Sequence, residues 1–576
     1  MVSSAISAKT SALSAVKTMF GQGMVTRQRI LLSAIAASLV FLISPASVTQ
    51  SSPESATDSN VYNIKTFGAT GDGKTLDTPA INKTIDAAAA AGGGTVYFPA
   101  GNYLSVSIHL KSNIALYLDQ GATIVAADTS NSAKYDPPEP NEWDKYQDFG
   151  HSHWHNSLIW GENLTNVSIL GPGTIWGKGL VRGGNQSRTQ QQNDALNAAR
   201  ASEPKQPFGY PNPRDAVEPG WGNKSIALKL CRNVIIRDIT ILHGGHFAIL
   251  ATGVENLTID NLKIDTNRDG IDIDACRNVR VSNCTVNSPF DDGICPKSSF
   301  ALGYARATEN VTITNCQVSG YDEGTLLDGT YKRDYNRYGA NSGPTGRIKF
   351  GTESNGGFKN ITIDNCVFDY CRGLALESVD GALLEDVTIS NITMRDIANC
   401  PIFLRLGSRM RGPSGAQVGA LRRVTLSNII VYNAEPKFAS IISGIPGHDI
   451  EDVTLNNVRI YYKGGGTKQQ AALEPPEKET DYPEPSMFGE IPAYGFFIRH
   501  VRGLEMSGVN ISYLKDDARA PFMISDAKYV EFRNLKAQRS SGVPAFILKD
   551  VDDFSIRDSY PLTDVRLPNV KQQVVN

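Results

Sequence analysis

An excess of charge of either sign is missing from this sequence: 56 Lys and Arg residues face 59 Asp and Glu residues over 576 positions, a net charge of −3. A basic surplus is the usual signature of nucleic-acid binding, so we expect no nucleic-acid partner. Helix-forming runs are also scarce, whereas Gly, Asn, Thr, Val and Ile are abundant. This composition is typical of a β-rich globular protein.

Long apolar runs are absent after the first 50 residues. The stretch RQRILLSAIAASLVFLISPASVTQ places Arg27 and Arg29 ahead of an apolar run over 30–43 that ends in small residues. Such a run is short for a bilayer span and is typical of a secretory signal, with an uncleaved anchor as the alternative. We therefore predict a targeting segment over 1–50, a secreted or periplasmic protein, and no membrane partner after processing.

Cysteine is sparse, with eight residues in the chain. In an exported protein they can form disulfides. However, Cys284, Cys316 and Cys366 each follow Asn at the same position of a repeated phrase. This shared phase favours a stack of buried thiols, because free Cys packs as a small hydrophobic residue. Bridges among the other cysteines are left open.

What the sequence does contain is one phrase that recurs along its middle. Each copy alternates β-branched and polar residues, as a half-buried strand does. A unit of this length cannot bury its own apolar face, so neighbouring units must stack. Short strands without intervening helices predict an all-β protein, a parallel β-helix in which each repeat is one coil. The best copies are NVIIRDITI, NLTIDNLKI, NVRVSNCTV, NVTITNCQV and NITIDNCVF, which begin at Asn233, Asn256, Asn278, Asn310 and Asn360.

The segment ahead of the coils has a different period. Residues 78–91 are Ala-rich and end at three glycines, which predicts a short helix. We expect this helix to cap the open N-terminal end of the solenoid. The predicted organisation is an N-terminal cap with the first coils over 58–130 and a β-helix catalytic domain over 131–560. Longer spacings between repeats predict loop insertions near 321–346 and 463–492.

Three carboxylates occur at an interval that matches one coil. In NRDGIDIDACRNVRVSNCTVNSPFDDGICPK, Asp269 precedes a Gly, and Asp291 and Asp292 precede another Gly 22 residues later. Adjacent coils lie about 4.8 Å apart, so all three side chains are expected on one face. A carboxylate group of this kind suits hydrolysis by a general acid and a base, and crowding raises one pKa. The alternative is that Asp before Gly only makes turns.

At these residues the chain resembles glycoside hydrolase family 28, the polygalacturonase and rhamnogalacturonan hydrolase family, from TFGATGDGKT to DVTLNNVRI. NRDGID is similar to the NTD motif of that family, with Arg268 in place of Thr. DDGICPKSS is similar to its DD segment, with Lys297 at the Lys that commonly follows. The resemblance implies a single-stranded right-handed, pectin-lyase-like parallel β-helix. It also implies an inverting reaction, with Asp291 as general acid and with Asp269 and Asp292 holding and deprotonating water.

Two further motifs of the family, GHG and RIK, are missing. TGRIKFGTESNGG stands where GHG belongs, and the RIK within it lies one coil too early to be the family motif. Residues 375–377, Ala-Leu-Glu, stand where RIK belongs. In polygalacturonases the Arg and Lys of RIK contact the sugar carboxylate. Their loss favours rhamnogalacturonan over homogalacturonan as substrate, and Glu377 would repel a uronate at the cleavage subsite.

Other residues are candidates to replace what is lost. Lys297, Arg347, Lys349 and Arg405 are expected to bind substrate, although Arg347, Lys349 and Arg405 fit solvated or turn-bonded cations equally well. His246, one coil ahead of Asp269, is a candidate for the role of the GHG histidine, with a packed or capping His as the alternative.

HSHWHNSLIW is a second stretch rich in histidine. His151, His153 and His155 alternate, as the ligands of a metal site can. A three-His metal site also needs an open position and supporting partners. We instead expect sugar-binding histidines beside Trp154, and we predict no metal and no cofactor.

Two rival functions remain open at this point. A polysaccharide lyase would bind calcium through the clustered Asp oxygens and use a basic residue to abstract a proton. A non-catalytic β-helix would keep the scaffold and only bind sugar. The persistence of all three carboxylates favours a hydrolase of pectic polysaccharide or oligosaccharide, expected to be a monomer. The long loops are expected to close one end of the groove, which favours exo-action.

Overall fold

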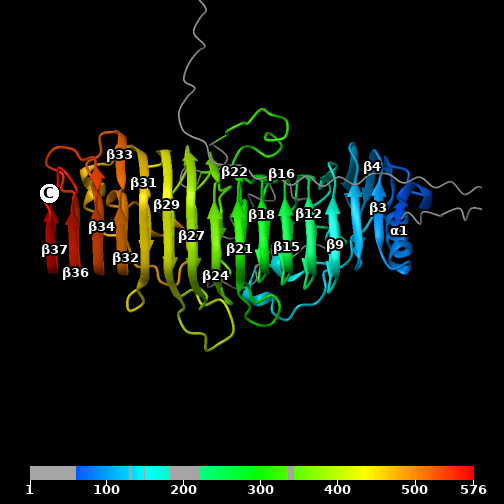
Figure 1. The fold of residues 1–576 in the computed structure, drawn as a ribbon, viewed down its shortest axis with the longest axis horizontal. Coiled ribbons are helices and arrows are strands. Elements are labelled where there is room, and N and C mark those ends of the chain that lie inside the picture. The colour runs from blue at the N-terminus through cyan, green and yellow to red at the C-terminus, as the bar shows by residue number, and fades with distance from the viewer. Residues whose placement is uncertain (1–59, 129–132, 148, 182–219, 335–342) are drawn as a thin grey trace, which may run out of the picture. The chain divides into compact units, whose positions relative to one another are not determined.

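Parallel strands stacked coil upon coil dominate the structure (Figure 1). The computed structural model describes residues 60–128, 133–147, 149–181, 220–334 and 343–576, so the predicted targeting segment lies outside the described residues. Ser59–Asn576 form a single compact unit. The predicted all-β parallel architecture is confirmed.

Each repeated phrase forms one rung of the longer sheet. The strands are β12 (Arg232–Arg237), β15 (Glu255–Asp260), β18 (Arg277–Ser282), β21 (Thr308–Thr314) and β24 (Phe358–Asp364). They pair in chain order, and their central apolar residues fall in register as Val234, Leu257, Val279, Val311 and Ile361. These side chains are 1% exposed, because period-two alternation points every second residue of each rung into the core.

The asparagine that opens each phrase has a structural reason. The backbone there is left-handed, with φ between 53° and 57° at Asn233, Asn256, Asn278, Asn310 and Asn360. Asn tolerates this conformation better than most residues. Each side-chain amide donates to the Asn carbonyl oxygen of the preceding coil, at 2.7–3.2 Å. The resulting ladder fixes the register of successive coils.

The predicted thiol stack is confirmed. Cys284, Cys316 and Cys366 are at most 1% exposed, and each thiol approaches the carbonyl oxygen two residues before it, at 3.1–3.3 Å. All eight cysteines are buried free thiols.

Both ends of the coil stack are covered. The predicted helix is α1 (Thr78–Ala90), whose buried residues Ile81 and Ile85 pack at the end of the stack seen in blue in Figure 1. At the other end, β36 (Phe546–Arg557) pairs antiparallel with β37 (Val565–Val575). Pairing with β37 covers the strand edge of the last coil. No helix among the described residues is long and apolar enough to cross a membrane.

The face that carries the candidate site is built by a second, shorter series of strands. In spatial order these are β5 (Ile108–His109), β8 (Ile159–Glu162), β11 (Lys224–Lys229), β14 (Phe247–Thr252), β17 (Asp269–Asp274) and β20 (Ile294–Lys297). A bridge between Ile294 and Ile348 continues this face to β23 (Lys349–Phe350), which is followed by β26 (Leu374–Ser378), β28 (Ile402–Leu406) and β30 (Ser440–Ser443).

Each segment predicted as an insertion leads from a strand outside this face into a strand of this face. The first lies between β22 (Gln317–Ser319) and β23, and part of it falls outside the described residues. The second runs from β31 (Ile450–Gly464) to β32 (Ala493–Ser507) and contains the short helices α3 (Lys468–Ala471) and η6 (Pro485–Phe488).

Candidate active site

The three predicted carboxylates come together. Asp269 opens β17, while Asp291 and Asp292 occupy the bend before β20. One oxygen of each lies within 4.8 Å of an oxygen of the others. Asp269 and Asp292 are 2% and 1% exposed, whereas the Asp291 side chain is 26% exposed. We call these three residues the carboxylate cluster, and Asp291 is its most accessible member.

Arg268 controls the charge of Asp291. Its Nε and Nη2 atoms both lie 2.9 Å from Asp291 Oδ2. Burial raises the pKa of Asp291, but Arg268, followed by Lys349 and Lys297, outweighs this and lowers it to about 2. Asp291 is therefore ionised in the free protein at ordinary pH.

Asp269 has the opposite environment. Burial, and then the charge of Asp291, raise the pKa of Asp269 well above its ordinary value. Within the part of the chain that the structure describes, Asp269 Oδ1 has no hydrogen-bond partner. Of the three carboxyl groups, Asp269 is thus the one whose surroundings favour the protonated form, and the role of general acid predicted for Asp291 requires Asp291 to receive a proton when substrate binds.

Replacing Arg268 tests this arrangement. Arg268→Thr removes the cation that keeps Asp291 ionised, so the pKa of Asp291 rises by about 1 to 3 units. If Asp291 is the acid, the limb of the pH profile along which kcat/KM falls with rising pH moves to higher pH by a similar amount. Arg277→Thr is the matched control, because it removes a guanidinium 2.9 Å from Glu309 on the longer sheet. This variant is expected to leave the pH profile unchanged. A limb that does not move in Arg268→Thr contradicts the role of Arg268.

His246 is linked to the cluster through Arg268. It is fully buried, and its Nδ1 lies 3.1 Å from Arg268 Nη1. Since a guanidinium only donates, His246 Nδ1 accepts, which places the ring proton of a neutral His246 on Nε2. The structure therefore makes His246 a positioning group for Arg268 rather than a residue that faces substrate.

Lys297 is a buried residue next to the site. Its Nζ is 3.2 Å from Glu353 Oε2 and 3.8 Å from Asp272 Oδ2. Asp272 Oδ2 is in turn 3.3 Å from His151 Nε2, and all four side chains are at most 6% exposed. Lys297 is thus part of a buried ionic network below the carboxylate cluster.

Arg347 and Lys349 lie beside the cluster as expected, but both are already paired. Arg347 Nε is 2.9 Å from Asp292 Oδ1, and Lys349 Nζ is 3.1 Å from Asp292 Oδ2. Lys349 is also 3.8 Å from Glu377 Oε2. Burial raises the pKa of Asp292, but Lys349 and Arg347 outweigh it and hold the pKa below its usual range. Burial raises the pKa of Glu377 to about 8 against the effect of the same two cations.

Arg405 has a different role from the predicted one. It is 1% exposed, and its guanidinium donates to Ser443 Oγ at 2.9 Å, to Gly444 O at 2.8 Å and to Lys478 O at 2.9 Å. These contacts tie the second insertion to the coil stack. Arg405 is a structural anchor here because its donors are directed at the protein itself.

The second insertion adds two site residues that the sequence did not reveal. Glu484 pairs with Arg347 Nη2, and its Oε1 is 3.1 Å from Arg372 Nη1. Tyr482 Oη is 3.5 Å from Lys349 Nζ. Only the fold brings these groups together, because Glu484 and Arg347 are 137 residues apart in the chain.

The HSHWH histidines do not converge. His151 Nε2 lies near Asp272, His153 Nε2 lies 3.1 Å from Asp144 Oδ1, and His155 Nε2 lies 3.0 Å from Glu162 Oε2. Trp154 is buried and donates to Thr252 Oγ1 at 3.1 Å, so it offers no surface to a sugar. His155 instead stacks on Trp160, with ring centroids 4.0 Å apart.

Two sets of side chains in the described residues are close enough to hold a cation. They are the carboxylate cluster itself and the group Asp269, Asp272 and Cys295, whose ligand atoms lie within 4.8 Å of one another. Arg268 and Lys297 form ion pairs with members of these sets. Their positive charges oppose cation binding, and the expected absence of a metal stays a prediction.

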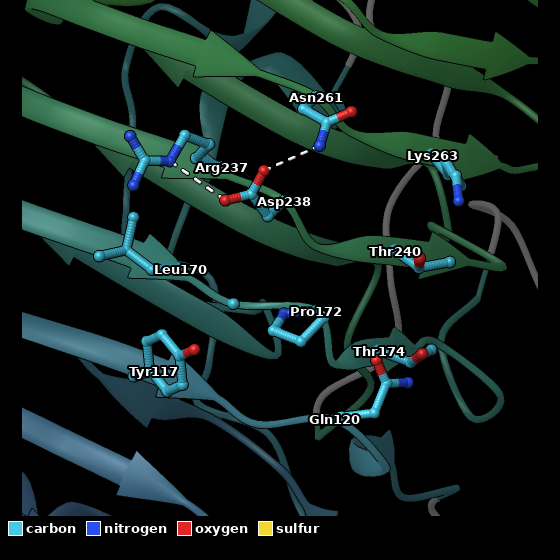
Figure 2. Close-up of a pocket in the computed structure, with 11 residues that line it drawn as sticks. Tyr117, Gln120, Leu170, Pro172, Thr174, Arg237, Asp238, Thr240, Asn261 and Lys263 are labelled. Atoms are coloured by element: carbon cyan, nitrogen blue, oxygen red, sulfur yellow. Dashed lines mark hydrogen bonds and ion pairs between the residues drawn. The ribbon is translucent and has the colours of Figure 1, made fainter.

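A separate open pocket of about 690 Å³ lies on the longer sheet (Figure 2). It is lined by residues of other strands, including Tyr117, Thr174 and Lys263, and it contains no member of the carboxylate cluster. Its Asp238 is engaged by Arg237 at 3.2 Å and by Asn261 at 2.8 Å. Nothing in this lining points to catalysis.

Known proteins share both the fold and the sequence pattern. The family profile described as rhamnogalacturonase A/epimerase, pectate lyase-like matches residues 61–213, and a right handed beta helix region matches 219–337. A probable polygalacturonase of Vitis vinifera is 27% identical over 425 residues, covering 69% of this chain and 73% of the relative. The solved structure of the Yersinia enterocolitica family 28 exopolygalacturonase has a TM-score of 0.58 at 20% identity, over 83% of this chain and 79% of that one.

The chain is thus similar in sequence to polygalacturonases, as its resemblance to glycoside hydrolase family 28 implied. It has the predicted right-handed β-helix. A 66-residue stretch is also 69% identical to the mannuronan C5-epimerase AlgE5 of Azotobacter vinelandii, covering 12% of this chain and 7% of the epimerase. That match is too short to carry an activity.

Proposed function

We propose that this family 28-like glycosidase hydrolyses pectic polysaccharides or their oligosaccharides with inversion, and that it acts outside the cytoplasm. The observation that carries the proposal is the carboxylate cluster, whose oxygens lie within 4.8 Å across adjacent coils. The probable polygalacturonase from Vitis vinifera supports a pectic substrate. Rhamnogalacturonan is favoured over homogalacturonan because Ala-Leu-Glu at 375–377 stands where the RIK motif of the family belongs.

The charges of the cluster suit acid–base hydrolysis. Asp292 stays ionised between Arg347 and Lys349, as a base that holds water must. Asp269 and Asp291 interact closely, so they titrate as a pair that holds one proton in the free protein. Asp291 is the more exposed of the two. It presents that proton to the leaving oxygen once its ion pair with Arg268 is broken. Inversion, with water attacking the opposite face of the sugar, is what the resemblance to family 28 implies. The spacing of the cluster does not itself select inversion, because oxygens within 4.8 Å of one another are closer than the about 6.5–9.5 Å typical of inverting carboxyl pairs.

Exo-action is supported by the second insertion. Tyr482 and Glu484 extend from it to Lys349 and Arg347, at the side of the site nearer the C-terminus. Side chains of the insertion occupy this side of the site, which favours binding of a chain end over binding of the middle of a polymer.

A lyase or epimerase is the second candidate, favoured by the match of residues 61–213 to the rhamnogalacturonase A/epimerase, pectate lyase-like profile. Either reaction needs an unprotonated base to abstract a proton from the sugar. Burial lowers the pKa of Lys349, but Asp292 and Glu377 outweigh it and hold the pKa well above its ordinary value. A lysine that stays protonated is a poor base, so hydrolysis is the better-supported chemistry.

Product analysis on homogalacturonan and rhamnogalacturonan distinguishes these reactions. Hydrolysis gives saturated products with new reducing ends, a lyase gives ultraviolet-absorbing unsaturated ends, and an epimerase leaves chain length unchanged. We expect saturated products, with faster cleavage of rhamnogalacturonan. Unsaturated ends or unchanged chains contradict the proposal.

A further inference from the structure

The cations nearest the carboxylate cluster are neutralised within the protein. Arg347 contacts Asp292 and Glu484, and Lys349 contacts Asp292 and Glu377. Arg347, Lys349, Asp292 and Glu377 are at most 2% exposed. A sugar carboxylate arriving at this point finds both cations already bound to protein carboxyl groups.

Glu484 is held firmly in this arrangement. Arg499 donates to Pro475 O at 3.1 Å and also to Pro476 O, while Arg405 donates to Lys478 O at 2.9 Å. These bonds fix the backbone of the insertion a few residues before Glu484. Arg372 Nη1, 3.1 Å from the same Glu484 oxygen that Arg347 contacts, completes the support. The carboxylate of Glu484 is therefore a built part of the subsite rather than a passing contact.

We propose that the sugar ring whose bond is cut is neutral, and that Glu484, together with Asp292, determines this specificity by occupying the cations that a uronate would need. This inference rests on the proposed hydrolase function and specifies its substrate. A uronate must displace a buried carboxyl group from Arg347 or Lys349, and a displaced buried charge is strongly unfavourable. A neutral ring leaves every ion pair intact.

The inference selects one bond in an alternating polymer. Rhamnogalacturonan alternates galacturonate with a neutral deoxyhexose, so it contains two kinds of glycosidic bond. Hydrolysis adds water across the cut bond: the sugar that donates the bond gains a hydroxyl and becomes the new reducing end, and the leaving oxygen gains a proton. A neutral reacting ring means that the new reducing end is the deoxyhexose.

The identity of the new reducing end tests this directly. Rhamnogalacturonan oligosaccharides are digested with the whole protein, new ends are reduced with borodeuteride, and the labelled sugar is identified by mass spectrometry. We expect the label on the neutral deoxyhexose. Label on galacturonate, or cleavage of homogalacturonan alone, overturns the inference while leaving the hydrolase function standing. Absence of saturated products from any pectic substrate overturns both.

One variant tests the assigned residue. Glu484→Gln removes one of the two carboxyl partners of Arg347, so cleavage of bonds donated by galacturonate rises about tenfold or more relative to bonds donated by the neutral sugar. Glu435→Gln removes a comparable partner from Lys463 outside the site and leaves the ratio unchanged. Thermal unfolding of both variants identifies either one that fails to fold. A ratio that stays constant in folded Glu484→Gln contradicts the assignment.

Discussion

Asp291→Asn is expected to lower kcat on the cleaved pectic substrate by about 10² to 10⁴-fold. The amide has nearly the shape of the carboxyl group, but it cannot deliver the proton that the leaving oxygen needs. Because Asp291 is partly exposed and makes its ion pair with a side chain that also reaches His246, the fold is expected to survive. Initial rates of reducing-end formation, measured alongside thermal unfolding, check both points.

Asp364→Asn is the matched control for that experiment. Asp364 lies on the longer sheet and accepts hydrogen bonds from Ser390 Oγ at 2.6 Å and from Asn391 Nδ2 at 2.8 Å. The substitution therefore alters a hydrogen-bonded Asp away from the carboxylate cluster. Its rate is expected to equal that of the unmodified protein. An Asp291→Asn protein that folds and keeps its full rate would place the chemistry elsewhere.

Arg409→Met is expected to destabilise the protein by about 3 to 5 kcal/mol. The Arg409 and Asp380 side chains are both 0% exposed, and Arg409 Nε lies 2.9 Å from Asp380 Oδ1. Losing the guanidinium leaves the Asp380 charge buried without its main partner. Arg409 Nη2 also donates to Thr352 O at 2.9 Å, a bond that is lost as well. The midpoint of urea unfolding is the measurement.

Two further variants separate the buried pair from a general effect of removing Arg. Arg409→Met combined with Asp380→Asn removes both charges and recovers part of the lost stability. Arg566→Met removes an exposed guanidinium 3.0 Å from Asp553 and leaves the midpoint unchanged, because exposed ion pairs contribute little. Equal losses in Arg409→Met and Arg566→Met would contradict the account of the buried pair.

The coil architecture was predictable because the repeat carries its own register. Every phrase begins with the Asn that forms the ladder and continues with alternating apolar residues, so its period reports the coil length. The 22-residue interval from Asp269 to Asp291 then places the carboxylate cluster on one face. The antiparallel strand β37 could not be predicted this way, since no copy of the phrase marks it.

The electrostatic partners of the site were less accessible to sequence reasoning. Arg268 was visible as a departure from NTD, but its ion pair with Asp291 depends on side-chain direction. Glu484 arrives on a long insertion that carries no repeat to place it. Arg405 was assigned to the right face but the wrong partners, because the carbonyl groups that it binds belong to that same insertion.

The direct test of hydrolysis at the carboxylate cluster is proton nuclear magnetic resonance of rhamnogalacturonan oligosaccharides during digestion by the purified protein. The α-linked substrate is predicted to give new reducing ends that appear first as the β-anomer and equilibrate later. New ends that appear first as the α-anomer would contradict inversion. Unsaturated ends, or no cleavage at all, would contradict hydrolysis at Asp269, Asp291 and Asp292.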